Sequence, residues 1–536
     1  MIYSLTFLLI VLLAYVRNLR DAHEDQRVKL FKTLGIEEPR KKKIVGFFHP
    51  YCNAGGGGER VLWAAVSFIQ RTEPDVISVV YSGDKDATKE QIIAKVKSRF
   101  DITLSPDTLH FVFLDSREYV EDAKWPRFTL LGQSLGSMYL AWEAVSQLVP
   151  DLYIDTMGYA FTFFAVSWLT GVPIGAYVHY PTISTDMLAR IQSRKTTHTN
   201  SDAIASSPIL SRGKLLYYRI FMYHYAQALR HASFIMVNSS WTKNHVDSIL
   251  AYSDPLLDAL HMPLEVIILP LRLIFKYILP TVSANKIPRT TPKEALIVCP
   301  SCDTREMSKL PLEGRERMVI SICQFRPEKD HPAQLRALSE LLRNYPQYRA
   351  PFTGIDGGVK LVLIGGSRND GDAARIEGLR QLAKDLDIEV HLMFALDQLT
   401  LAYPKFSHAQ DHVEFAVNAP FPEMLTYLAR ASIGLNTMVD EHFGINVVEY
   451  MAAGLIPISH ASGGPLHDII VPYDGQPTGF HARDPASFAE AIYKALSLPK
   501  EEELALRQRA RARAVEAFSE QAFEEGWKAS GWRQWL

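Results

Sequence analysis

Short apolar runs alternate with longer stretches of helical spacing through most of the chain after residue 44. Short apolar runs bounded by turn residues are typical of buried strands, and strands that alternate with helices form parallel sheets. The first group of runs is Ile44–Phe48, Asp75–Tyr81, Leu109–Leu114, Leu152–Ile154 and Ile174–His179. The second group is Val319–Cys323, Lys360–Ile364, Val390–Phe394, Ile433–Asn436 and Ile456–Ser459. The pattern therefore predicts an α/β protein with two parallel, doubly wound sheets.

The length of 536 residues also favours two domains, because single cores stop growing at about 250–300 residues. We expect two Rossmann-like lobes that face a cleft, the first over residues 44–250 and the second over residues 311–500. Ligands of such folds bind at the carboxyl ends of the strands, so the cleft is the default ligand site. Residues 251–310 are expected to form an insertion or linker, and residues 501–536 to form helices that pack back on the first lobe.

The N-terminus begins with Ile2–Val16, an apolar run without a charged residue. It is slightly shorter than the roughly 20 residues that span a bilayer, and no cleavage signature precedes Arg17. We therefore expect residues 1–20 to be an uncleaved transmembrane anchor. Basic residues follow the run at Arg17, Arg20, Arg27, Lys29, Lys32 and Arg40–Lys43. The positive-inside rule then predicts a lumenal N-terminus and a cytosolic body.

Leu264–Val282 is strongly apolar, but it contains three charged residues, Glu265, Arg272 and Lys276, and is interrupted by two prolines. Charged residues disfavour a simple spanning helix. Two interpretations remain open: an interfacial or re-entrant membrane-associated segment, or a buried core helix, which length and apolarity do not separate.

Composition limits the class of protein further. The net charge is -2 and 22% of the residues are charged, which gives no indication of a nucleic-acid partner. The cysteines, Cys52, Cys299, Cys302 and Cys323, are too few for a disulfide framework and favour a reducing compartment. Cys299 and Cys302 form a lone C-x-x-C without a second pair, so an ordinary loop is favoured over a zinc site.

The segment Glu441–Glu449 has the pattern of a helix start that binds a diphosphate. Gly444 precedes an apolar helical run, and a glycine there lets the first N–H groups of the helix approach an anion. Glu449 would lie about 7 Å along the helix axis from Gly444, where it would reach ribose hydroxyls. Glu441 would accept hydrogen bonds from sugar hydroxyls on the other side. From spacing alone, ordinary helix-start and surface acids are the more probable interpretation.

Two other segments follow predicted strands and have candidate phosphate chemistry. Gly57 and Gly58 belong to a four-glycine run before a helix, without the spacing of a dinucleotide fingerprint. They form a concavity for phosphate or acceptor, or else a mobile loop without a ligand. Arg326 and Lys329 would neutralise a leaving diphosphate, although exposed basic residues after a strand are usually only solvated.

Two further polar residues follow strands of the first lobe. His179 ends a predicted strand and is the best catalytic candidate, while a lone histidine is more often structural. Asp155 follows Leu152–Ile154 and is a weaker candidate for contact with an acceptor.

Glu441–Glu449 resembles the E-x-F-G-x-x-x-x-E signature of the retaining family 4 glycosyltransferases, which have the GT-B fold. Gly463–Pro465 and Gly479–Phe480 match this family as well, and the resemblance covers most of the chain after about residue 44. It implies catalytic roles for His179 and Glu441. It also implies donor-binding roles for Gly57, Gly58, Arg326, Lys329, Phe443, Gly444 and Glu449.

Within family 4, the runs His49–Arg60, Val178–Pro181 and Asp440–Gly444 resemble the mannosyltransferases of asparagine-linked glycosylation. This resemblance implies alpha-1,2 transfer of mannose from GDP-mannose to a dolichol-diphosphate-linked oligosaccharide, adding its fourth and fifth mannoses at the cytosolic face of the endoplasmic reticulum membrane. Other mannosyltransferases of the pathway are candidate partners, and nucleic acid is not. The alternatives are a family 4 enzyme that uses a UDP sugar, or a non-catalytic scaffold subunit.

The resemblance has consequences for mechanism. No protein nucleophile is evident, so we expect a front-side displacement in which the leaving diphosphate helps to activate the acceptor hydroxyl. No Asp-x-Asp stands where a metal-dependent transferase would need it, so we expect no metal cofactor and activity that survives chelation. The long insertion near Tyr252–Pro292 departs from the family pattern.

Overall fold

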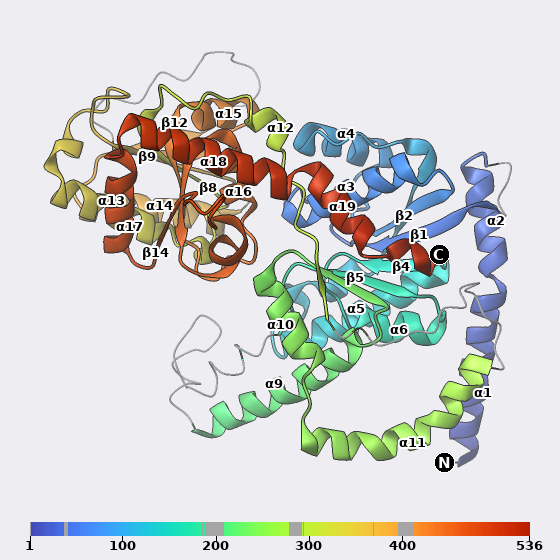
Figure 1. Cartoon of the computed structure of the whole chain (residues 1–536). Helices are drawn as coiled ribbons and strands as arrows, with labels where there is room; N and C mark the ends of the chain where they lie inside the picture. The colour runs from blue at the N-terminus through green and yellow to red at the C-terminus, as the bar shows by residue number, and fades with distance from the viewer. Residues whose placement is uncertain are drawn as a thin grey trace. The chain divides into compact units, whose positions relative to one another are not determined.

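The computed structural model describes residues 2–36, 41–183, 208–277, 294–367, 369–394 and 412–536, with the single residues Met187 and Pro292. It consists of two compact units (Figure 1). The first unit contains Met1–Asn238, Thr242–Val298 and Glu524–Leu536, and the second contains Ser239–Trp241 and Cys299–Phe523. Residues 278–291 of the expected insertion or linker, which include residues 278–282 of the apolar segment, lie outside the described residues.

The first unit has a seven-stranded parallel sheet with the strand order β3-β2-β1-β4-β5-β6-β7. The strands are β1 (Lys43–Phe48), β2 (Val76–Ser82), β3 (Leu109–Phe113), β4 (Leu152–Asp155), β5 (Ile174–Val178), β6 (Phe234–Val237) and β7 (Leu296–Ile297). The order reverses between β1 and β4. This switch point is where open parallel sheets bind ligands.

The first unit also contains α-helices, several of which cover the two faces of this sheet. They are α1 (Ile2–Asp21), α2 (His23–Thr33), α3 (Gly57–Thr72), α4 (Lys89–Phe100), α5 (Thr129–Gln147), α6 (Thr162–Leu169), α9 (Pro208–Leu229), α10 (Ser240–Leu250), α11 (Pro255–Tyr277) and α19 (Glu520–Ala529). Buried apolar residues of α5, α6 and α9 form one core with Ile44 and Tyr153 of the strands. On the other face, Trp527 of α19 lies 6.5 Å from Phe47 and 6.3 Å from Tyr177, measured between ring centroids.

The N-terminal helices pack on the first unit through two of the basic residues that we had assigned to the flank of a membrane anchor. Arg20 donates to the carbonyl of Leu169 at 3.0 Å. Arg27 donates to Asp151 Oδ2 at 2.6 Å, and the same oxygen accepts from the backbone N–H of Ile44. Both arginines are buried, so they hold α1 and α2 on the sheet. None of the helices, as far as their residues are described, combines the length and apolarity that crossing a bilayer requires.

Helix α11 contains Pro263 and Pro270, and most of the apolar side chains of this helix that the structure describes are exposed. Its exposed apolar side chains include Leu256, Leu260, Met262, Val266, Leu269 and Leu273, each between 46% and 67% exposed. A core helix would bury these side chains. The described part of this segment is therefore not the buried core helix that the sequence left open.

The second unit has another seven-stranded parallel sheet, with the order β10-β11-β9-β8-β12-β13-β14. Its strands are β8 (Glu316–Ile322), β9 (Lys360–Gly365), β10 (Val390–Phe394), β11 (Val413–Val417), β12 (Ala431–Asn436), β13 (Ile456–His460) and β14 (Phe480–Ala482). Here the switch point lies between β8 and β12. The order of strands thus predicts a second ligand-binding edge, at the ends of these two strands.

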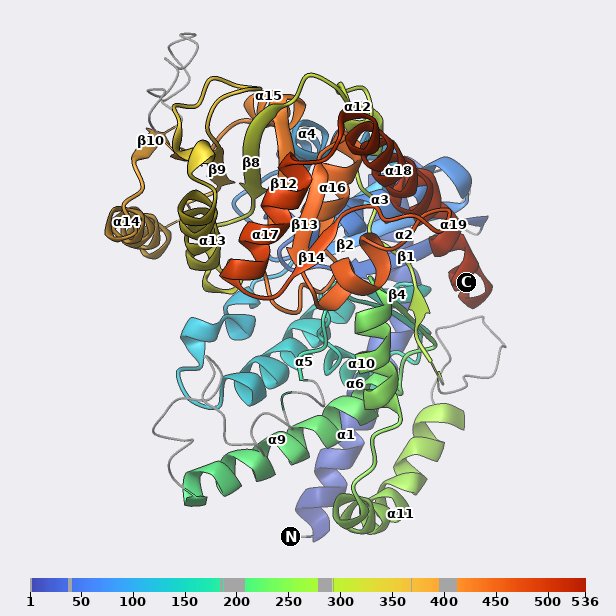
Figure 2. The same ribbon diagram turned by 60° about the vertical axis from the view of Figure 1, so that its left-hand side comes forward.

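The helices of the second unit also form two layers (Figure 2). They are α12 (Thr304–Met307), α13 (His331–Asn344), α14 (Asp370–Asp385), α15 (Phe421–Arg430), α16 (Ile445–Ala453), α17 (Pro485–Leu496) and α18 (Lys500–Phe518). Helices α13 and α17 share one core, and α16 and α18 share the other. Residues 501–536, expected to return to the first lobe, are therefore divided: α18 packs on the second sheet, and only Glu524–Leu536 belongs to the first unit.

The sequence located all ten strands that it predicted, with ends that differ by a few residues. It missed β6, β7, β11 and β14, which are short or have polar residues inside them. The architecture of two parallel α/β units is confirmed.

Candidate functional site

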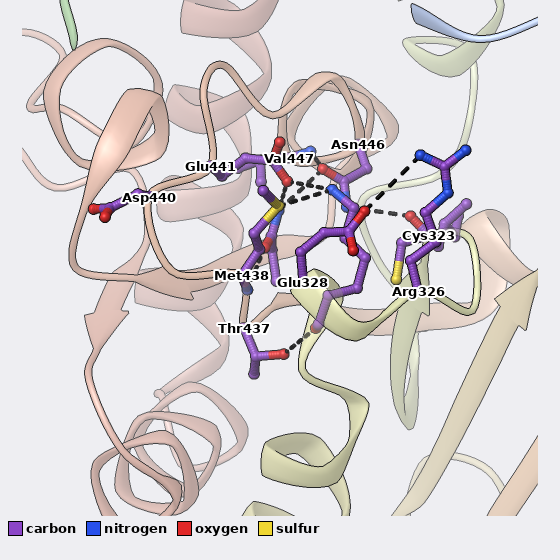
Figure 3. Close-up of polar contacts among 12 residues, drawn as sticks. Cys323, Arg326, Glu328, Thr437, Met438, Asp440, Glu441, Asn446 and Val447 are labelled. Carbon is purple, nitrogen blue, oxygen red and sulfur yellow. Dashed lines mark hydrogen bonds and ion pairs between the residues drawn. The ribbon is translucent and has the colours of Figure 1, made fainter. Parts of the chain in front are cut away.

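Two of the predicted site residues form an ion pair at the switch point of the second unit (Figure 3). Lys329 lies in the 3-10 turn Pro327–Lys329 that follows β8, and Glu441 lies in the loop that follows β12. Lys329 Nζ donates to Glu441 Oε2 at 2.6 Å and lies 3.1 Å from Met438 Sδ. The side chains are 22% and 12% exposed, so the pair is largely buried but still in contact with solvent. The sequence predicted both residues but not that they bind each other.

Arg326 lies in the same turn and has an incompletely satisfied guanidinium. Its Nε is buried and has no hydrogen-bond partner among the described residues, while its side chain is 41% exposed. The other contact is a long ion pair of 3.9 Å with Glu328. An arginine in this state can bind an oxyanion without first losing a strong partner.

Helix α16 begins directly after Gly444, as the sequence predicted. Gly444 precedes the helix with φ of 108°, a backbone conformation that side chains with a Cβ rarely adopt. The first N–H groups of an α-helix have no partner within the helix, and the helix dipole favours an anion there. Glu449 is partly exposed in the second turn of α16. The Phe443 ring is only 3% exposed and packs against Phe518, so the ring belongs to the core rather than to a ligand surface.

The glycines Gly463 and Gly464 hold the loop that contains Glu441. The N–H of Gly464 donates to the carbonyl of Glu441 at 2.8 Å. A Cβ on Gly463 would lie 2.2 Å from that carbonyl oxygen, and one on Gly464 would lie 2.6 Å from the carbonyl oxygen of Phe443. Only glycine permits this approach, which explains the Gly-Gly-Pro motif as a support for Glu441.

A second cluster occupies the switch point of the first unit. His179 follows β5, and its Nε2 lies 3.2 Å from the carbonyl oxygen of Thr156, which follows β4. A carbonyl oxygen only accepts, so Nε2 has the proton in this hydrogen bond. The backbone carbonyl of His179 accepts from Asn238 Nδ2 at 2.8 Å. The imidazole is therefore held at both its ring and its backbone.

His49 connects this cluster to the glycine loop. Its Nδ1 is hydrogen-bonded to Thr156 Oγ1 at 2.8 Å and its Nε2 to Glu59 Oε1 at 3.3 Å, and its side chain is fully buried. Glu59 also accepts from the backbone N–H of Gly56 at the start of α3. Burial raises the pKa of Glu59, but the hydrogen bond and charge of His49 and the N–H of Gly56 outweigh it, so the pKa is below its usual value.

The predicted glycines Gly57 and Gly58 form the first turn of α3 beside this cluster. A Cβ on Gly58 would lie 3.5 Å from His179 Nε2, so the imidazole lies close to this turn and a side chain at Gly58 would touch it. Asp155 is fully buried, and its carboxylate accepts from the backbone N–H groups of Met157 and Gly158. Burial raises its pKa to about 7, with those hydrogen bonds opposing the shift. Contact between Asp155 and an acceptor would require this turn to open.

Sequence reasoning overlooked several polar residues at these two edges. His49 and Thr156 support His179 in the first unit. In the second unit the Thr437 hydroxyl donates to the carbonyl of Lys329 at 2.9 Å, and Asn436 contacts Glu441. The signal was available, since each of these residues ends or closely follows a strand. What the sequence does not show is which strand ends are neighbours.

The chain matches two family models. Residues 42–250 match the model described as ALG11 mannosyltransferase N-terminus, and residues 404–514 match the model described as Glycosyl transferases group 1. A Xenopus laevis protein named GDP-Man:Man(3)GlcNAc(2)-PP-Dol alpha-1,2-mannosyltransferase is 42% identical over 99% of this chain and 94% of its own. The human protein of the same name is 42% identical over 90% of this chain and 86% of its own.

Solved structures with the same fold are much more distant in sequence. The alpha,alpha-trehalose 6-phosphate synthase of Burkholderia multivorans superposes with a TM-score of 0.58 at 14% identity, over 92% of this chain and 98% of that one. Anabaena HepE in complex with UDP and glucose gives a TM-score of 0.51 at 14% identity, over 91% and 98%. At this identity the likeness shows the fold, which is that of the GT-B glycosyltransferases. Together with the curated relatives, it shows that the chain is a glycosyltransferase and belongs to the family of GDP-Man:Man(3)GlcNAc(2)-PP-Dol alpha-1,2-mannosyltransferases.

Proposed function

We propose that this protein transfers mannose from GDP-mannose, in alpha-1,2 linkage and with retention, to a dolichol-diphosphate-linked oligosaccharide, adding the fourth and fifth mannoses. The observation that carries the proposal is the cluster of Lys329, Arg326 and Glu441 beside the start of α16, in a chain whose relatives have this activity in their names. The cations would bind the diphosphate, and Glu441 would bind hydroxyls of the mannose.

The chemistry follows from where charge develops. As the bond between mannose and the diphosphate breaks, negative charge grows on the leaving phosphate, and the Lys329 ammonium, the Arg326 guanidinium and the N–H groups of α16 would stabilise it. The leaving oxygen would take the proton of the acceptor hydroxyl on the same face of the sugar, so the configuration is retained. We propose that these fixed cations and dipoles replace a metal ion. His179 would contact the reacting sugar or the acceptor.

We further propose that the protein acts at the cytosolic face of the endoplasmic reticulum membrane, held there by its N-terminal helix and by α11. The exposed apolar side chains of α11 support this, because a helix with so much uncovered apolar surface is stabilised in an interface with lipid. Ile10 and Val11 of α1 are also exposed, at 58% and 48%. An acceptor with a dolichol tail requires such an attachment.

Sugar transfer by the full chain in detergent tests the activity. A lipid-diphosphate acceptor with three mannoses is incubated with GDP-mannose or with UDP-N-acetylglucosamine, each with and without EDTA. We expect incorporation of mannose, resistant to EDTA, and products with one and two added residues. Transfer from the UDP sugar alone would favour the other family 4 activity. No transfer from either donor, with co-purification of other mannosyltransferases, would favour a scaffold.

Flotation with vesicles tests the membrane proposal separately. Serine at Val266, Leu269 and Leu273 should reduce the fraction of protein that floats with vesicles of neutral and anionic phospholipid. Ile355 of the second unit, 54% exposed, is the matched control, and Ile355→Ser should float as the unchanged protein does. Equal flotation of the triple variant and the control would contradict a role for α11.

A further inference from the structure

Asn436 is a buried amide at the carboxyl end of β12, only 4% exposed, and its orientation is fixed. Its Oδ1 accepts from the backbone N–H of Met438 at 3.0 Å. The Nδ2 donor group is therefore turned the other way, where it lies 3.4 Å from Glu441 Oε2 and 3.2 Å from Asn446 Oδ1. A reversed amide would place an oxygen against two oxygens, which is unfavourable.

Asn446, in the first turn of α16, has the second side-chain amide of this network, and its orientation is also fixed (Figure 3). Its Nδ2 donates to the carbonyl of Ile322 at 3.2 Å, and its Oδ1 accepts from the N–H of Val447 at 3.0 Å. One turn later, the Tyr450 hydroxyl accepts from the backbone N–H of Ile322 at 2.6 Å. The end of β8 is thus tied to α16, and α16 to the end of β12.

Two donors, one of them the Asn436 amide that these contacts orient, bind the same oxygen of Glu441. Oε2 accepts from Lys329 Nζ and from Asn436 Nδ2, whereas Oε1 makes no hydrogen bond to another residue in the described part of the chain. With Oε2 held from two directions, the carboxylate cannot rotate without losing an ion pair and an amide contact. Oε1 is then the oxygen that is available to a ligand hydroxyl.

We propose that Asn436 is a positioning residue of the donor site, whose amide holds Oε2 of Glu441 so that Oε1 binds a hydroxyl of the donor sugar. The inference rests on the proposed function, because it requires a sugar nucleotide in the second unit. It predicts that Asn436 affects recognition of the sugar and not of the nucleoside diphosphate. A residue that only stabilised the fold would affect both.

Calorimetric titration of the full chain in detergent with GDP-mannose and with GDP tests this prediction. Asn436→Ala should weaken binding of GDP-mannose about tenfold, the effect of one lost hydrogen bond to a charged group, and change binding of GDP less than about twofold. In a Glu441→Gln background the same substitution should have little further effect, because two residues that act through one contact are not additive. Asn344→Ala, on the exposed last residue of α13, is the matched control and should bind both ligands normally.

Asn436→Asp separates positioning from stability. The aspartate retains an acceptor for the Met438 N–H but places a negative charge against Glu441 and Asn446. If Asn436 positions Glu441, Asp should weaken GDP-mannose binding more than Ala does, although it preserves more of the local contacts. The melting temperature of each variant shows whether it is folded.

Two results would overturn the inference. One is an equal loss of affinity for GDP and GDP-mannose in Asn436→Ala, and the other is full additivity with Glu441→Gln. If the unchanged protein binds GDP but not GDP-mannose, the proposed donor is wrong and the inference fails with it. If it binds GDP-mannose and Asn436→Ala binds it equally well, only the inference fails.

Discussion

The switch point of the first unit is lined by imidazole, hydroxyl and backbone carbonyl groups, whereas that of the second unit contains an ammonium, a guanidinium and a carboxylate. In the first unit the charged group, Glu59, is buried behind His49 and holds a glycine loop. In the second, Lys329 and Arg326 are partly exposed. The two edges thus present different chemistry, and the partly exposed cations are the reason why we place the diphosphate on the second unit.

The comparison also shows how each edge is made rigid. His179 is fixed by hydrogen bonds to groups at the neighbouring strand ends. Glu441 is fixed by an ion pair and by amide and glycine contacts. Hydrogen bonds to strand-end groups are enough to position an imidazole, whereas a pair of largely buried charges also needs hydrogen-bond partners for the polar atoms around it.

Removing the cation of the second unit should have the largest effect. Lys329→Met keeps the length of the side chain but leaves Glu441 without its partner and the diphosphate without its ammonium. We expect the transfer rate to fall by about a thousandfold, as for other lost electrostatic contacts to a leaving group. Lys309→Met is the matched control, because Lys309 makes a similar but exposed pair with Glu306. A thousandfold loss in the control, or less than a tenfold loss in Lys329→Met, would refute the assignment.

Removing the imidazole of the first unit should have the next largest effect and a different signature. His179→Ala should lower the rate of transfer by about a hundredfold, within the range of positioned acid, base or hydrogen-bonding groups. Its binding of GDP should be unchanged, because we place the diphosphate on the cations of the second unit and His179 belongs to the first unit. Steady-state rates and GDP titrations measure the two quantities. His110→Ala, on the edge strand β3, serves as the control and should transfer normally.

Glu59→Gln should have a smaller effect, since Glu59 acts through His49 and the glycine loop. The amide can keep a contact with either His49 or the Gly56 N–H but loses the charge that both contacts use. We expect about a tenfold loss of transfer and about 1–2 kcal/mol of stability, the usual cost of a charged hydrogen bond. Denaturant unfolding and transfer assays check the two values. A variant with unchanged stability would show that the buried pair is not holding α3.

The smallest effect concerns His331, which lies under the site of the second unit against Cys323 and Phe325. Burial, followed by the charges of Lys329 and Arg375, lowers its pKa to about 4. Its folded pKa is thus below the unfolded value near 6.5, so the unfolded chain binds the proton first as pH falls, and stability is lost between those values. We expect His331 to account for about 1 kcal/mol of loss between pH 7 and 5.5.

His331→Phe keeps an aromatic ring beside Phe325 and removes the titration. The free energy of unfolding of the second unit is measured at pH 7 and at pH 5.5. Between these two values it should fall by about 1 kcal/mol less in the variant than in the unchanged protein. An identical pH dependence in the two proteins would mean that the imidazole is not held neutral in the folded state. His412→Phe would not be a suitable control, because His412 hydrogen-bonds the carbonyl of Val359. Replacement of His467, which is on the surface turn after β13, is preferable.

Much of the fold could be predicted from the sequence because parallel strands are apolar on both faces. Val390–Phe394 and Lys360–Ile364 were located in this way. β11 was missed because it contains Glu414, a buried carboxylate that contacts Tyr427 and Lys360, partners that lie in other segments. Such a strand is polar in sequence and satisfied only in the folded chain.

Some residues of the candidate site could be predicted from the sequence and others could not, because the partners of the latter lie in distant segments of the chain. Glu441 and Gly444 belong to one continuous motif, and Lys329 to another, so a resemblance could identify each. Asn436 and Thr437 are single polar residues at the end of a strand, and their role depends on the turn and loop that β8 and β12 bring together. Arg20 and Arg27 show a related limit, because the sequence pattern placed them beside an apolar run but could not show that they also bind Leu169 and Asp151 of the first unit.

Titration of GDP into the unchanged protein, Lys329→Met and His179→Ala tests most directly that the diphosphate binds the cationic edge of the second unit. The account predicts that GDP binds the unchanged protein and His179→Ala with equal affinity and binds Lys329→Met at least about thirtyfold more weakly, as expected for a lost charge-assisted contact. Equal affinity for all three proteins, or a loss confined to His179→Ala, would contradict it.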